Sequence, residues 1–139
     1  MDSVYIIYLN VLFNVYLIAI SIIVQFIVYP SFNKILESFT EYHSRYKKKI
    51  FWIVGPVMIL EILTSLLMIL NEFDIYLIPG LIVLLLWMLT FIYIVPLHKE
   101  LSKQFQTNKH IKLLKLNFVR IILWALKFFV LIIILIFYN

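Results

Sequence analysis

The chain has 139 residues, of which 65% are hydrophobic and 14% are charged. A soluble domain is roughly half apolar and about a quarter charged. The composition therefore excludes a water-soluble globular protein and predicts an integral membrane protein. The lack of cysteine excludes disulfides, thiolate catalysis and cysteine-ligated metal or iron–sulfur centres. The net charge is +5, but the basic residues flank apolar segments and form no patch suited to nucleic acid, so we expect the lipid bilayer, and no nucleic acid, as a partner.

Four apolar segments are each long enough to cross about 30 Å of hydrocarbon, which takes about 20 helical residues. The sequence predicts membrane helices at residues 4–29, 50–70, 76–95 and 111–138. The predicted fold is therefore all-α, with residues 1–139 forming one transmembrane domain, a four-helix bundle.

The first segment carries polar residues inside an otherwise apolar helix. Their spacing places them on one face of that helix: Asn10, Asn14, Ser21 and Gln25. Pro30 is expected to end the helix, because proline lacks an N–H and clashes with the preceding turn. Residues 31–48 carry apolar side chains at helical spacing, with His43 among them, and are predicted to form an amphipathic helix on the membrane surface.

The second segment contains an acidic residue, Glu61, eleven residues from its start, or about 16 Å along a helix and near the bilayer midplane. The third segment is expected to end at Pro96. Residues 97–109 are predicted to be a second amphipathic stretch, with His98 on its apolar side, whereas His110 is expected to be solvated. The first and third segments end in the similar sequences FIVYP and FIYIVP, which suggests two similar hairpins.

The fourth segment has the most informative pattern. Residues spaced three, four and three apart share one helical face: Asn117, Arg120, Trp124 and Lys127. A charge inside a membrane costs on the order of 2.5–3.5 kcal/mol on insertion scales, so both cations are expected to face a partner or a cavity.

Counting from the expected helix starts, Glu61 and Arg120 lie close enough in depth to form an ion pair, whereas Lys127 has no acid at its level and is expected to hydrogen-bond Asn14. The interior would then hold one acid and two cations. This net positive charge suits an anionic or carbonyl-bearing ligand. A simpler interpretation is that the polar residues only hold the helices together.

The lysines and arginines predict the orientation. Five lie within residues 31–49 and five within 97–115, whereas the N-terminus and the loop between the second and third helices have none. Because cytoplasmic loops are enriched in Lys and Arg, both long connections are predicted to be cytoplasmic and both termini outside.

Two chemistries could use the polar residues. His43, His98 and Glu61 are candidate catalytic residues and supply a two-histidine, one-carboxylate ligand set for non-haem iron or zinc, although no local motif such as HxxxH supports it. Alternatively, a histidine or Glu61 acts as a general base while cationic and amide side chains hold an oxyanion. The candidate ligand-binding residues are Gln25, Asn117, Arg120, Trp124 and Lys127.

Isolated positions over most of the chain resemble small bacterial four-helix membrane proteins of uncharacterised function, which are broadly similar to the anthrone-oxygenase-like membrane family. The residues that carry the resemblance are Pro30 with Phe32, Tyr42-His43, Pro56 with Glu61, Pro96-x-His98, and Asn117-x-x-Arg120 with Trp124 and Lys127. The last helix of those proteins typically reads Asn-Trp-x-Arg-Thr-x-x-Trp-x-x-Arg; here Phe118, Ile121 and Lys127 replace the Trp, the Thr and the last Arg. The resemblance implies a four-helix fold and an oxidoreductase acting with oxygen on a hydrophobic substrate. It also implies a location in the cytoplasmic (inner) membrane of a bacterium.

The sequence thus predicts a small membrane enzyme or binding protein for a lipophilic molecule, such as a quinone or a polyketide-like aromatic, with a polar site in the cytoplasmic half of the bundle. One alternative is a structural or accessory subunit of a larger membrane complex, in which the stripe of the fourth segment faces a partner helix. Another is a small homo-oligomeric transporter, which would have only Glu61 for proton coupling within the membrane.

Overall fold

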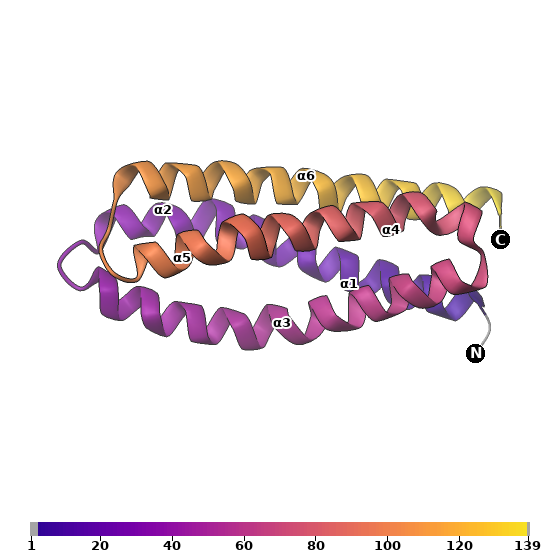
Figure 1. The fold of residues 1–139 in the computed structure, drawn as a ribbon, viewed down its shortest axis with the longest axis horizontal. Coiled ribbons are helices and arrows are strands. Elements are labelled where there is room, and N and C mark those ends of the chain that lie inside the picture. Colours follow the sequence, from indigo (N-terminus) through magenta and orange to yellow (C-terminus); the bar gives the residue numbers. More distant parts are fainter. Residues whose placement is uncertain (1–2, 139) are drawn as a thin grey trace.

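The computed structural model describes the backbone of residues 3–138, which is almost entirely helical (Figure 1). In chain order the elements are α1 (Ser3–Ile23), η1 (Val24–Val28), α2 (Tyr29–Ser31), η2 (Phe32–Lys34), α3 (Phe39–Asn71), α4 (Phe73–Met88), η3 (Leu89–Ile94), α5 (Val95–Leu101) and α6 (Thr107–Phe137). They join into four helical rods, each long and apolar enough to cross a membrane: Val4–Lys34, Phe39–Asn71, Phe73–Leu101 and Thr107–Phe137. The predicted four-helix architecture of an integral membrane protein is confirmed at this level.

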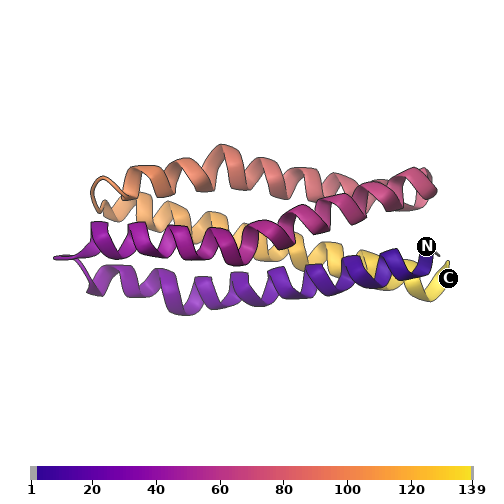
Figure 2. The ribbon, with the colours of Figure 1, turned by 90° about the horizontal axis from the view of Figure 1, so that it is seen from below.

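The rods alternate in direction. Helices α1 and α4 each pack against both α3 and α6, so α3 and α6 face each other across a diagonal of the bundle. Both chain ends and the joint between α3 and α4 lie at one end, and the connections 35–38 and 102–106 lie at the other (Figures 1 and 2). We call the latter the basic end, because the ten basic residues within 31–49 and 97–115 accompany these connections, and the former the terminal end.

The bundle is apolar outside and partly polar inside. Its exposed side chains are mostly large hydrophobic residues, such as Leu12, Leu63 and Ile133. The buried polar side chains instead line the interior and come from all four rods: Asn10, Asn14, Ser21, His43, Glu61, Thr64, Ser65, Thr90, His110, Asn117, Arg120 and Lys127. Polar side chains turned inward and hydrocarbon turned outward are what a bilayer requires.

Pro30 and Pro96 do not end their helices, which corrects the expected boundaries. Each proline follows a π-helical turn, Val24–Val28 or Leu89–Ile94, and the chain remains helical to Lys34 and Leu101. In a π-turn the hydrogen bonds span five residues, as in the bond from the Tyr29 N–H to the Val24 carbonyl, and this wider turn makes room for the proline ring. The Ser31 hydroxyl donates to the Val28 carbonyl oxygen at 2.7 Å, so this carbonyl also has a hydrogen-bond partner.

The two expected surface helices are instead ends of the membrane rods. Residues 39–49 form the first turns of α3, and residues 97–101 the last turns of α5. The apolar face that suggested surface helices is buried against neighbouring rods, in a cluster that includes Phe32, Phe39 and Leu101. An amphipathic pattern identifies the apolar face of a helix, but it does not show whether that face contacts lipid or a neighbouring helix.

The two glycines make a matched test of the packing. A Cβ at Gly80 of α4 would overlap the Ile69 side chain of α3, whereas at Gly55 it meets only the Phe51 ring, at 3.7 Å. Gly80→Val is therefore expected to lower the free energy of unfolding by about 1–3 kcal/mol, the usual cost of overpacking, and Gly55→Val by much less. Thermal unfolding in detergent measures both, and equal effects would contradict the close α3–α4 contact.

Candidate functional site

The centre of the bundle holds an ion pair between Glu61 of α3 and Lys127 of α6, both fully buried. The Lys127 ammonium donates to Glu61 Oε1, to Asn10 Oδ1 at 2.8 Å and to Ser65 Oγ at 3.1 Å. All three of its N–H groups thus have acceptors, as a buried ammonium requires.

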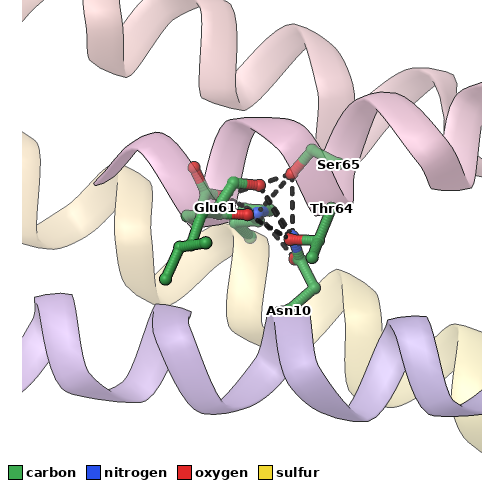
Figure 3. A network of polar contacts seen from close by, with 6 residues as sticks. Asn10, Glu61, Thr64 and Ser65 are labelled. Carbon is green, nitrogen blue, oxygen red and sulfur yellow. Dashed lines mark hydrogen bonds and ion pairs between the residues drawn. The ribbon is translucent and has the colours of Figure 1, made fainter. Parts of the chain in front are cut away.

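Asn10 connects this pair to α1. Its amide Nδ2 lies 3.0 Å from the Glu61 carbonyl oxygen, 2.7 Å from Thr64 Oγ1 and 2.9 Å from Ser65 Oγ. Figure 3 shows these side chains converging from neighbouring helices onto one point. Because the contacts join three rods, the network fixes the axial register of α1, α3 and α6.

The expected Glu61–Arg120 pair is wrong, and so is the expectation that Lys127 lacks an acid. Both arose from placing the helix starts at residues 50 and 111. The helices begin at Phe39 and Thr107, so Glu61 lies 22 residues and Lys127 20 residues from the basic end, against 13 for Arg120. At about 1.5 Å per residue, Arg120 lies roughly 13 Å closer to the basic end of the bundle than Glu61 does. Asn14, the expected partner of Lys127, has no partner for either amide atom among the described residues.

The stripe of the fourth segment is confirmed as a buried face, with different surroundings for each residue. Asn117 donates to the Ser21 carbonyl at 3.1 Å and to Gln25 Oε1 at 2.8 Å. Trp124 packs in an apolar cluster with Leu17, Met58, Ile82 and Leu86. These contacts hold helices together, as the simpler interpretation expects.

Arg120 differs from the rest of the stripe. Its side chain is buried, with 8% exposed, and one guanidinium nitrogen donates to Ser21 Oγ at 3.3 Å. Its Nε has no partner, and no carboxylate within residues 3–138 forms a salt bridge with it. A guanidinium has five N–H donors, so most of this group's capacity remains free.

Arg120 lies at the wall of a cavity of about 770 Å³ between α3 and the rod formed by α4, η3 and α5. Its lining comes from four rods and is largely apolar: Ile20, Val24, Tyr29, Tyr46, Lys47, Lys48, Ile50, Phe51, Trp52, Val54, Gly55, Met58, Ile59, Trp87, Thr90, Phe91, Ile94, Val95, His98, Lys99 and Arg120. Both π-turns contribute to this wall, and such turns are frequent at functional sites.

The cavity extends from the outer surface to the core. Trp52, Phe51 and Phe91 at its rim are more than half exposed, at 74%, 63% and 52%, whereas Tyr29 is only 2% exposed. Lys47, Lys48, Lys99 and Arg120 are all cationic, and none of the described lining residues is acidic. The space therefore opens on the surface that would face lipid and carries positive charge at its polar part.

Beside this cavity, His43 of α3 and His98 of α5 form one hydrogen-bonded chain. His98 Nε2 lies 3.0 Å from the Tyr29 hydroxyl, and His98 Nδ1 lies 3.0 Å from His43 Nε2. His43 Nδ1 in turn lies 3.0 Å from Ser102 Oγ. The prediction that the histidines point with the apolar residues is confirmed for His43, which stacks on Phe39 and is fully buried. His98 is half-buried, with its ring beside that of Tyr29.

The proposed metal ligands are not brought together. Glu61 lies 18 residues along α3 from His43, or about 27 Å on a straight helix, and its carboxylate is bound to Lys127. All four imidazole nitrogens of His43 and His98 already have partners. Within the described part of the chain, no group of three or more His, Cys, Asp or Glu could hold a metal ion.

His110 was expected to be solvated, and this is wrong: its side chain is 1% exposed, and Nε2 lies 2.7 Å from the Tyr29 carbonyl oxygen. Sequence reasoning also missed Tyr29 and Ser102. Tyr29 follows Gln25 by four residues, the same step that relates Asn10 to Asn14, so extending that stripe past the expected helix end would have included it. Nothing in the sequence singles out Ser102.

No protein-family model, curated protein or solved structure matches the chain.

Removing Lys127 tests the central pair. Lys127→Met leaves the Glu61 carboxylate buried and uncompensated, so the free energy of unfolding is expected to fall by about 3–5 kcal/mol, as for other broken buried pairs. Glu61→Gln combined with Lys127→Met should recover much of the loss, and Arg120→Met, which leaves no carboxylate behind, should cost far less. Reversible unfolding in detergent measures all three; similar losses for both single variants would contradict the assignment of Glu61 to Lys127.

Proposed function

We propose that the protein binds a lipophilic molecule with an oxygen-bearing head, anionic or carbonyl, in the cavity between α3 and the α4–η3–α5 rod. The observation that carries the proposal is Arg120, a buried guanidinium that lines the cavity without a carboxylate partner in the described chain. The head binds Arg120, and the apolar body occupies the outer part of the cavity.

The energetics support an oxygen ligand. A buried cation is costly unless an opposite charge or several hydrogen bonds compensate it. Ser21 supplies one acceptor, at 3.3 Å. An oxyanion or carbonyl oxygen would occupy the remaining donors, and guanidinium–oxyanion contacts are among the strongest hydrogen bonds in proteins.

The outer part of the cavity supports the lipophilic body. Trp52, Phe51, Trp87 and Phe91 surround it with aromatic surface, which suits a flat aromatic ring as well as an acyl chain. Because the rim is exposed on the apolar outside of the bundle, the ligand reaches the cavity from the bilayer. A quinone or a polyketide-like aromatic meets these requirements, and oxygen chemistry on such a molecule remains a prediction of the family resemblance.

In this proposal the basic end faces the cytoplasm, in agreement with the distribution of lysine and arginine, and the membrane is the cytoplasmic membrane of a bacterium. The cavity then opens in the cytoplasmic leaflet, where Lys47, Lys48 and Lys99 at its wall are close to anionic lipid head groups.

The cysteine-free sequence makes this orientation directly testable. Single cysteines replace Glu72, at the joint of α3 and α4, and Gln104, in the connection at the opposite end; both positions are exposed. A membrane-impermeant maleimide on intact cells should label Glu72→Cys, and Gln104→Cys only after lysis. The reverse pattern would show that the basic end is outside.

Binding is tested on protein purified in mild detergent, by native mass spectrometry followed by identification of retained small molecules. Wild type is expected to retain a lipophilic molecule with an acidic or carbonyl head. Arg120→Met removes charge-assisted hydrogen bonds worth about 1.5–3 kcal/mol. The affinity for the ligand should therefore fall at least tenfold, and the fraction of the protein that retains the ligand should fall with it. Gly55→Leu places a side chain in the cavity, where a Cβ meets only Phe51, and should also exclude the ligand.

The matched control is Arg45→Met, which removes an arginine from an exposed pair with Glu41 and should leave the retained molecule unchanged. A ligand-free wild type, or equal retention by wild type and Arg120→Met, would overturn the proposal. Co-purification of a stoichiometric membrane protein in place of a small molecule would favour the accessory-subunit alternative. A retained bilayer phospholipid lost from Arg120→Met would support the site and identify its occupant as lipid.

A further inference from the structure

A hydrogen-bonded chain leads from the cavity toward the surface of the basic end. Tyr29 and His98 line the cavity, His43 lies behind them, and Ser102 is half-buried at the end of α5. The three successive separations between Tyr29, His98, His43 and Ser102 are each 3.0 Å. This is a continuous path of exchangeable protons through an otherwise apolar cluster.

The direction of every bond in this chain can be assigned. Ser102 Oγ lies 2.7 Å from the His98 carbonyl oxygen, which can only accept, so the single hydroxyl hydrogen of Ser102 is used there. Ser102 Oγ must then accept from His43 Nδ1–H. It follows that His43 Nε2 accepts from His98 Nδ1–H, and that His98 Nε2 accepts from the Tyr29 hydroxyl. All donors point from the cavity toward Ser102, with both imidazoles neutral.

We propose that Tyr29, His98, His43 and Ser102 form a proton relay that removes the proton from a weakly acidic hydroxyl on the ligand bound beside Arg120. The ligand class is thereby narrowed to lipophilic phenols, hydroquinones and enols. This inference rests on the proposed function, because it needs a ligand head in the cavity.

The step balances without an oxidant or a second substrate. The ligand O–H bond breaks, and its proton passes to the Tyr29 oxygen as Tyr29 gives its own proton to His98 Nε2. His98 Nδ1 passes a proton to His43 Nε2, and His43 Nδ1 passes one to Ser102 Oγ. The hydroxyl hydrogen that Ser102 donated to the His98 carbonyl oxygen turns away from it and is released to water. The electron pair of the broken bond stays on the ligand as an oxyanion, and one proton appears in solution.

The charges around the relay favour this direction. The groups that face it from neighbouring elements are Tyr46 and Lys47 of α3, Lys99 of α5, and His110 and Arg120 of α6. None of these is acidic, so a proton is repelled from the cavity whereas an oxyanion is held there by Arg120. Electrostatic stabilisation of a developing oxyanion by a fixed, desolvated cation is a common and large effect.

The probe is an octyl-substituted para-nitrophenol, used with purified protein at a pH where the free phenol is protonated. Its phenolate has a visible absorption band, so ionisation is observed directly. Binding is followed separately by quenching of tryptophan fluorescence, since Trp52 and Trp87 line the cavity. In stopped-flow measurements corrected for empty micelles, wild type should show saturable quenching and the phenolate band with the same time course.

Two variants interrupt the relay. Tyr29→Phe removes the hydroxyl at the cavity and keeps the aromatic ring. His43→Phe removes both imidazole nitrogens but keeps a ring that can stack on Phe39, and residue 43 does not line the cavity. His43→Phe should bind with unchanged quenching, whereas Tyr29→Phe loses its own contact with the ligand hydroxyl and should bind more weakly. At saturating probe, the phenolate band should appear at least tenfold more slowly in both variants. Tyr42→Phe, an exposed tyrosine on the same helix, is the matched control and should behave as wild type.

The outcomes separate the relay from the binding site. Suppose that the probe quenches the tryptophan fluorescence of wild type but not of Arg120→Met, so that binding at the cavity is shown. The relay is then overturned, and the proposed function stands, if wild type forms no phenolate. The same conclusion holds if Tyr29→Phe and His43→Phe form the phenolate as fast as wild type. If wild type shows no saturable quenching, the proposed function fails. A purely structural role for the histidines would change stability or affinity in His43→Phe without delaying the phenolate behind binding.

Discussion

The ion pair between Glu61 and Lys127 determines how charge is distributed in this bundle. It crosses the diagonal from α3 to α6, and Asn10 and Ser65 accept the other two hydrogen bonds of the Lys127 ammonium. Glu61 is the only acidic side chain among the buried residues of the described structure. Once it is committed to Lys127, the other buried cation, Arg120, has no internal counter-ion. The pair thus explains why a guanidinium is available at the cavity.

The same pair fixes the positions of the helices along the bundle axis. With α1, α3 and α6 held at the Asn10–Glu61–Lys127 level, the other polar residues of α1 fall opposite those of α6, so that Ser21 meets Arg120 and Asn117. Near the basic end, the π-turns at Val24–Val28 and Leu89–Ile94 directly precede the short helices α2 and α5, which carry Tyr29 and His98. A cavity wall that is both apolar and hydrogen-bonded results from these combined constraints.

Much of the architecture follows from composition and spacing. Four apolar segments, the buried stripe Asn117 to Lys127 and the inward histidines are all consequences of periodicity, and the structure agrees with them. The pairing of charges did not follow, because it depends on where helices begin. Placing the start of α3 at residue 50 instead of Phe39 shifted Glu61 by about three turns and exchanged Lys127 for Arg120 as its partner.

The candidate site was predictable only in part. Arg120, His43 and His98 were expected from their residue types, but the cavity and the Tyr29–His98 contact arise where two distant segments meet. Proline ends a helix in most sequences, but here a π-turn before each proline lets the helix continue. No residue pattern in the sequence indicates such a π-turn. His110 could not be assigned because lysines on both sides of it in the sequence suggested solvent, whereas helical geometry turns it inward to the Tyr29 carbonyl.

The guanidinium of Arg120 is available at the cavity because Glu61 is bound to Lys127 and no other described carboxylate pairs with Arg120. The most direct measurement is a nitrogen–carbon dipolar distance by solid-state NMR in bilayers, with labelled lysine or arginine side chains and labelled glutamate carboxyls. Subtracting the Glu61→Gln spectrum isolates Glu61 from exposed pairs such as Glu41 with Arg45. Glu61 is expected to couple to a lysine ammonium and to no arginine. Coupling of Glu61 to an arginine guanidinium would contradict this expectation.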